Sequence, residues 1–150
     1  MTPFAILVAF LAAGHTGEKM RVQIFFEHDS LERVLQFRHD PSVLPVGVFP
    51  VDRMVSSSTP ARESLEELLR GPTDGEQAKG YSTNLENLHL VGISLKEGVA
   101  SVRFNGLLRL RGTLSGARLR AQVERTLRQF PSVRRVLIWI NNKPDFDSLR

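Results

Sequence analysis

The sequence has no cysteine, few aromatic residues and no hydrophobic run long enough to cross a membrane. The absence of cysteine excludes disulfides, thiolate catalysis, lipid attachment through cysteine and zinc sites built from cysteine. Aromatic residues make up only 7% of the chain, which argues against a platform for stacking bases. The longest apolar run covers residues 4–13, whereas a membrane-spanning helix needs about 20 apolar residues.

The remaining composition is typical of one folded domain. Its 150 residues match the usual domain size, and 41% of them are hydrophobic, which is enough to form a core. The formal charge of +4 is a modest excess, since 16 acidic residues are mixed with 20 basic ones, most of them arginine. A basic surface patch is therefore compatible with the composition but is not required by it.

The N-terminal segment is similar to the start of an exported protein. The apolar run at residues 4–13 is followed by small residues and then polar chain, as in a signal peptide cleaved near Gly14. No basic residue precedes the run, and His15 stands where a lipoprotein would carry its lipid-bearing cysteine. A buried first strand is the alternative. We expect a signal-peptide-like segment at residues 1–17, one domain at residues 18–144 and a polar tail at residues 145–150.

The N-terminal part of the domain reads as strands. Apolar and polar residues alternate over residues 22–28, which predicts a half-buried strand, and residues 33–40 are its expected hairpin partner. Residues 43–55 contain Pro45 and Pro50, and prolines this dense are not tolerated in a central strand. We expect an edge strand or a crossing segment there, with residues 51–55 still able to pair.

A helix is predicted directly after these strands. Thr59 is the expected N-cap, Pro60 the first helical residue, and Gly71 with Pro72 the end. Its apolar residues recur at helical spacing and form one buried stripe. They are Ala61, Leu65, Leu68 and Leu69.

The second half of the chain predicts a hairpin, a helix and a strand. Residues 88–95 and 99–104 form the hairpin, residues 115–130 the helix, and residues 134–140, apolar after two arginines, a central strand. The buried stripe of this helix is Leu119, Val123, Leu127 and Phe130. The predicted order is αββαβ, preceded by N-terminal strands. We therefore expect an α+β protein, a small two-layer sandwich in which both helices pack on one mixed sheet.

Four polar residues lie on the face of the second helix opposite its apolar stripe. They are Arg118, Gln122, Arg125 and Gln129. We expect this face to be exposed and name it as the candidate interaction face, with an ordinary solvated surface as the alternative. The arginines also leave open a cytosolic module that binds nucleic acid through this face.

The glycine-rich stretch after the first predicted helix resembles a phosphate-binding loop only superficially. Gly75 and Gly80 have the required separation, but Tyr81 stands where a lysine is needed, and Lys79 comes one position early. A helix precedes this stretch and a strand follows, which is the reverse of the required order. We interpret it as the end of a helix and a polar link.

No catalytic or metal-binding constellation is predicted. His28 and His39 are each followed by aspartate, but a hairpin would place the two pairs at opposite ends, so we expect scattered surface histidines and no metal. His89 is expected to point out of its strand. A small hydrolase stays an alternative if a cleft gathers at least two of four residues, namely Glu27, His28, Asp29 and His89. We expect no catalytic residues and no cofactor.

Residues 22–144 resemble the sporulation and spore germination (GerMN) domain family. The motifs that carry the resemblance are the helix end "LLRGPT", the link "DGEQAKGYSTNL", the hairpin "LVGISLKEGVASVRF" and the segment "TLRQFPSVRRVLIWINNKP". The stretches "VQIFFEHD" and "VFPVDRMV" are similar to the N-terminal strands of the family.

The resemblance implies an exported or membrane-anchored protein of the bacterial envelope. It also implies a core similar to the ring-building motif, which assembles through side-to-side contacts of small domains, and it supplies no catalytic residues. We therefore predict a non-enzymatic, envelope-associated domain that binds a protein or a cell-wall component. Self-association into a homo-oligomer is a further alternative, and nucleic acid is the less favoured partner.

Overall fold

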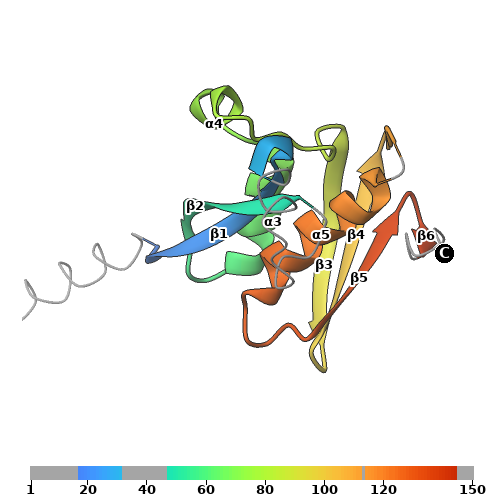
Figure 1. Cartoon of the computed structure of the whole chain (residues 1–150). Helices are drawn as coiled ribbons and strands as arrows, with labels where there is room; N and C mark the ends of the chain where they lie inside the picture. The colour runs from blue at the N-terminus through green and yellow to red at the C-terminus, as the bar shows by residue number, and fades with distance from the viewer. Residues whose placement is uncertain (1–16, 32–46, 113, 145–150) are drawn as a thin grey trace, which may run out of the picture.

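The computed structural model describes residues 17–31, 47–112 and 114–144 (Figure 1). Its elements are, in chain order, β1 (Lys19–Glu27), β2 (Val48–Ser56), α3 (Pro60–Arg70), α4 (Asp74–Ala78), β3 (Leu88–Lys96), β4 (Val99–Gly106), α5 (Ser115–Arg128), β5 (Arg135–Ile140) and β6 (Lys143–Pro144). The predicted α+β class and the order αββαβ, formed by α3, β3, β4, α5 and β5, are confirmed. The polar link additionally contains the short helix α4, which the sequence analysis missed.

The strands form two separate sheets. The larger sheet has the order β3-β4-β5-β6 and is mixed, because β4 and β5 are parallel while the other neighbours are antiparallel. Strands β1 and β2 pair antiparallel over their full length in a sheet of their own. The expectation of one sheet was therefore wrong. The second edge of β1 is hydrogen-bonded by the side chains of Thr126 in α5 and Gln129 directly after it, and at Glu27 by the backbone of Ser82.

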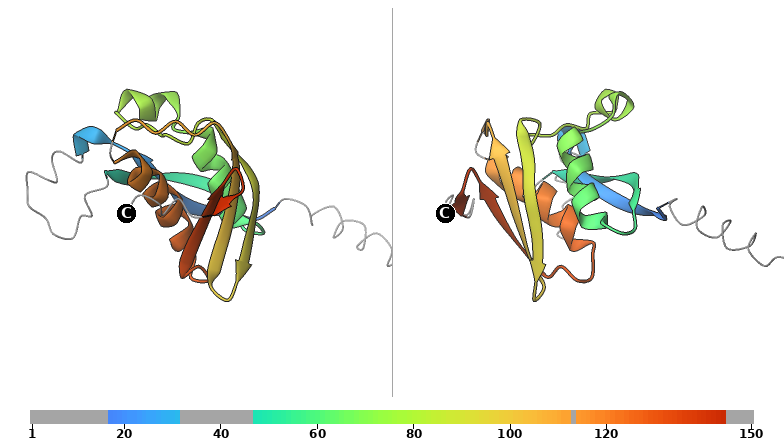
Figure 2. Two further views of the ribbon diagram at one scale, coloured as in Figure 1. Left: turned by 90° about the vertical axis from the view of Figure 1, so that its right-hand side faces the viewer. Right: turned by 180° about the vertical axis from the view of Figure 1, so that it is seen from behind.

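Helices α3 and α5 pack on one face of the larger sheet and also contact β1 (Figure 2). One core cluster connects all these elements. It includes Ile24 and Phe26 of β1, Leu65 of α3, Phe104 of β4 and Leu127 of α5, each at most 1% exposed. The predicted apolar stripes of both helices belong to this cluster, although Ala61, Leu69 and Phe130 are only partly buried.

The helix ends and the hairpin turn lie at the residues that the sequence predicted. Thr59 holds the N-cap position of α3 without a side-chain capping hydrogen bond, and Pro60 is the first helical residue. Gly71 ends the helix with a positive φ of 86°, a conformation that glycine adopts without strain. Glu97 and Gly98 both have positive φ values, 53° and 79°, and form the two-residue turn of the β3–β4 hairpin. These boundaries confirm the predicted helix and hairpin.

The second face of the larger sheet has no helix on it within the described part of the chain (Figure 2). Arg103 of β4 and Trp139 of β5 are cross-strand neighbours on this face, which alternates with the buried one. The guanidinium carbon of Arg103 lies 4.4 Å from the centroid of the Trp139 ring, a cation–π contact. The face therefore combines apolar and cationic groups.

Several predicted segments lie outside the described residues. These are residues 1–16 of the signal-peptide-like segment, the expected hairpin partner at residues 33–40, and the tail at residues 145–150. In the three described ranges, no helix has both the length and the apolar character that crossing a bilayer requires.

Candidate interaction groove on α5

Helix α5 packs on the core with one side and on β1 with another, so part of the predicted interaction face is not exposed. Gln122 is fully buried, so its expected exposure was wrong. Its side-chain amide nitrogen donates to Asn84 Oδ1 at 2.9 Å and to Glu27 Oε1 at 3.2 Å, and its oxygen accepts a hydrogen bond from Thr83 at 2.9 Å. A buried amide needs such partners, and Gln122 therefore ties α5 to β1 and to the segment before β3.

Gln129 and the buried Thr126 form hydrogen bonds with the edge of β1 that does not pair with β2. The Gln129 side chain accepts a hydrogen bond from Gln23 N at 2.9 Å and donates to Gln23 O at 2.7 Å. Thr126 Oγ1 accepts a hydrogen bond from Phe25 N at 3.2 Å. An unpaired strand edge is a template for unwanted pairing with another chain. The side chains of Gln129 and Thr126 use backbone groups of β1 that such a strand would otherwise bond.

The two arginines of the predicted face also contact neighbouring elements. Arg118 Nη1 lies 2.9 Å from Asp29 Oδ1 and 3.9 Å from Glu27 Oε2. Arg125 Nη1 donates to the carbonyl oxygen of Val48 at 3.3 Å. All four predicted residues thus have partners within the domain, and the nucleic-acid alternative stays an untested prediction.

The outward surface of α5 lies one step further around the helix and forms a groove against β1. The groove has a volume of about 590 Å³, and its apolar lining residues, which we call its floor, are Phe25, Ala117 and Ala121. Phe25 reaches it because alternate residues of β1 point away from the core side occupied by Ile24 and Phe26. We call this surface the α5–β1 groove.

The other lining residues of the α5–β1 groove are charged or polar, and we call them its rim. Arg120 and Glu124 form an ion pair at 2.6 Å along the helix. Arg125 and Arg128 line the same groove, and Gln129 closes it toward β1. Of the predicted face, Arg125 and Gln129 therefore border the groove, whereas Arg118 and Gln122 do not. The uncharged stripe Gln122, Thr126 and Gln129, at i, i+4 and i+7, was the sequence signal for a second covered side.

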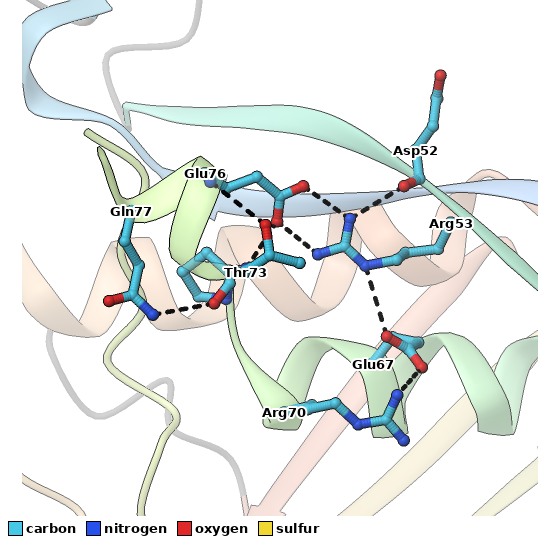
Figure 3. A network of polar contacts seen from close by, with 8 residues as sticks. Asp52, Arg53, Glu67, Arg70, Thr73, Glu76 and Gln77 are labelled. Atoms are coloured by element: carbon cyan, nitrogen blue, oxygen red, sulfur yellow. Dashed lines mark hydrogen bonds and ion pairs between the residues drawn. The ribbon is translucent and has the colours of Figure 1, made fainter. Parts of the chain in front are cut away.

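A second charged cluster connects β2, α3 and α4 (Figure 3). The guanidinium of Arg53 binds both carboxylate oxygens of Glu76, at 2.8 and 2.5 Å, and its Nε lies 3.4 Å from Glu67 Oε2. Glu76 also accepts a hydrogen bond from Thr73 N, and Thr73 Oγ1 accepts one from Glu76 N, which is a capping box. Only 15% of the Arg53 and 18% of the Glu76 side chain is exposed.

The electrostatics of this cluster indicate a structural role. The hydrogen bonds from Arg53 lower the pKa of Glu76 from its ordinary value of 4.5 to about 2, and the same contact raises the pKa of Arg53. Both groups are therefore charged at neutral pH, and each neutralises the charge of the other. We assign the cluster to the attachment of α4 rather than to chemistry.

Of the two His-Asp pairs that suggested catalysis, the structure describes His28 and Asp29, whereas His39 and Asp40 lie outside the described residues. His28 is buried, not a surface residue as expected; its ring packs edge-on against Tyr81 at 4.7 Å, and its Nδ1 accepts a hydrogen bond from Leu31 N at 3.3 Å. His89 is exposed as predicted, while Asp29 turns to Arg118. The described residues contain no group of three or more side chains able to hold a metal ion.

The fold is that of a GerMN-type α+β domain, and a family comparison gives the assignment. The family model described as sporulation and spore germination (Germane) matches residues 28–146. The chain belongs to this family, which confirms the resemblance seen in the sequence.

Solved structures of low sequence identity share the fold. The tandem GerMN domains of the sporulation protein GerM from Bacillus subtilis superpose with a TM-score of 0.57 at 16% identity, covering 87% of this chain and 42% of that one. The first GerMN domain of the same protein superposes with a TM-score of 0.54 at 18% identity, covering 84% of this chain and 86% of that one. No curated protein sequence matches this chain significantly.

Proposed function

We propose that this protein is a non-enzymatic, envelope-associated domain that binds a protein partner through the α5–β1 groove. The observation that carries the proposal is the groove itself, a hollow of about 590 Å³ with an apolar floor and a charged rim. The chain belongs to the sporulation and spore germination family, and the resemblance to that family implies side-to-side contacts of small domains and supplies no catalytic residues.

The composition of the groove suits a protein segment. Ala117 and Ala121 are small, so a partner backbone can approach the helix closely, and Phe25 offers apolar area that binding would bury. Interfaces gain affinity from such a desolvated centre and specificity from a polar rim. The side chain of Arg128 forms no ion pair with the described residues and is exposed, which favours an acidic group on the partner.

The groove is tested by a pull-down from the envelope fraction of the native host. Ala121→Arg fills the floor of the groove, and Ala78→Arg makes the same change at an exposed position of α4. We expect a partner that the wild type and Ala78→Arg retain and that Ala121→Arg loses, with unchanged circular dichroism for all three. Retention of the same partner by Ala121→Arg would reject the groove as the binding surface.

The envelope location is a separate part of the proposal. It is supported by the apolar run at residues 4–13 with its small-residue end, and by the family to which the chain belongs. Fractionation of the native host, followed by mass spectrometry of the N-terminus, tests it. We expect the protein outside the cytosol; full-length protein with Met1 intact in the cytosol would contradict export.

A further inference from the structure

A polar pocket lies where β3 begins and β4 ends, apart from the α5–β1 groove. Its volume is about 260 Å³, and four segments that are distant in the sequence line it. They are the end of β1, residues 83–87, residues 109–111 and the first turn of α5. Separate segments of the chain thus converge on one concave polar surface.

The walls of this pocket are held in place by a continuous chain of hydrogen bonds. The Ser115 hydroxyl donates to the carbonyl oxygen of Arg111, and the Asn84 side chain donates to the carbonyl oxygen of Ser115 at 2.9 Å. Asn84 in turn accepts a hydrogen bond from Gln122, which is fully buried. The pocket is therefore organised before any ligand arrives, which lowers the entropic cost of binding.

The charges in the pocket are unbalanced. Three arginines line it, and Arg118 among them is neutralised by its ion pair with Asp29. Arg109 and Arg111 are exposed and form no side-chain hydrogen bond or ion pair with the described residues. Of the acidic residues in the lining, Glu27 is engaged by Gln122 and Arg118, which leaves Glu86. The remaining lining charges are thus two guanidinium groups and one carboxylate.

We propose that this pocket binds a small oxyanion, a carboxylate or phosphate group, through Arg109 and Arg111. Guanidinium groups bind both oxyanions with charge-assisted, often bidentate hydrogen bonds. Asn87 and Glu86 on another wall provide hydrogen-bond acceptors, which suits a ligand that carries hydroxyl or amide groups beside the anion. The proposal does not depend on the α5–β1 groove, which uses other residues.

The test is a titration of the full chain followed by NMR of its backbone amides at constant ionic strength. Inorganic phosphate and acetate are the two anionic probes, and glucose is the neutral control. We expect saturable shifts at the amides of Asn84, Asn87 and Ser115 with at least one anion and none with glucose. The anion that binds more tightly identifies the source class as phosphate or carboxylate.

Matched double variants distinguish binding in the pocket from general electrostatic attraction of anions to the protein. Arg109→Gln with Arg111→Gln removes the two pocket guanidiniums, and Arg125→Gln with Arg128→Gln removes the same charge from the groove. We expect the pocket variant to lose at least about tenfold in affinity, the usual effect of deleting hydrogen bonds to charged groups, and the groove variant to bind as the wild type does. No saturable shift, or an equal loss in both variants, would overturn the proposal.

Discussion

Arg53 shows at the scale of one residue how a charged side chain can serve the fold. It stands on β2, yet it binds Glu76 of α4 and Glu67 of α3, and its guanidinium carbon lies 6.0 Å from the ring centroid of Phe26. Helix α4 has no buried residue of its own. Its position is therefore set by this ion pair and the capping box rather than by apolar packing.

Replacement of the carboxylate that binds Arg53 is expected to destabilise the protein in a pH-dependent way. Glu76→Gln should lower the free energy of unfolding by about 1–3 kcal/mol at pH 7, since a charge-assisted pair is lost. The folded pKa of Glu76, about 2, lies below its ordinary value of 4.5. The stabilisation is therefore complete above pH 4.5 and is lost as the pH falls toward 2. Urea unfolding at several pH values measures the difference.

The control for this prediction is Glu66→Gln. Glu66 forms an ion pair with Arg62 along α3, but both side chains are about half exposed, at 47% and 48%. Such surface pairs contribute little, about 0.5 kcal/mol or less. Equal and pH-independent effects of the two substitutions would contradict the assigned role of Glu76.

At the scale of elements, α5 stabilises β1, a strand that pairs with β2 along only one of its two edges. Gln129→Ala removes both hydrogen bonds to the backbone of Gln23. We expect a loss of about 1 kcal/mol in the free energy of unfolding and faster hydrogen exchange at the Gln23 amide. Arg128→Ala, at the exposed neighbouring position, should change stability by less than about 0.5 kcal/mol. An unchanged Gln23 exchange rate would show that the edge is not held by α5.

The elements themselves were largely predictable from the sequence. Thr59, Pro60 and Gly71 mark the ends of α3 by local backbone chemistry, and the turn after Lys96 follows from Gly98, which adopts positive φ without strain. These signals act within a few residues and need no knowledge of the rest of the chain. The same holds for the apolar stripe of α5.

The environment of α5 was not predictable in the same way. A helical periodicity of apolar residues reveals a side packed on a hydrophobic core, but not a side packed on the backbone of a strand edge. Gln122 and Thr126 are buried because they hydrogen-bond to other parts of the chain, and their partners are distant in sequence. The sequence therefore predicted an exposed position for Gln122, which is fully buried in the structure.

At the scale of the whole molecule, the two sheets share one core. Ile24 of β1 is fully buried in the same cluster as Val102 of β4 and Leu119 of α5. We therefore expect the two sheets to unfold together. Ile24→Ala should lower the free energy of unfolding by about 2–5 kcal/mol and reduce hydrogen-exchange protection in β4 by a similar amount.

The control for this prediction is Val91→Ala at a position of β3 that is 54% exposed, where only a small effect is expected. A loss of protection confined to β1 and β2 after Ile24→Ala would show that the smaller sheet opens independently. That outcome would also weaken the α5–β1 groove as a binding surface, because Phe25 of β1 forms part of its floor.

The contact between Arg103 and Trp139 also has a spectroscopic consequence. Trp139 is the only tryptophan of the chain, and it lies in β5 on the face without helices. Unfolding of the larger sheet separates the indole from the guanidinium 4.4 Å above it and transfers the ring to water. Its fluorescence emission is therefore an intrinsic optical probe of the larger sheet, which makes unfolding measurable at low protein concentration without a label.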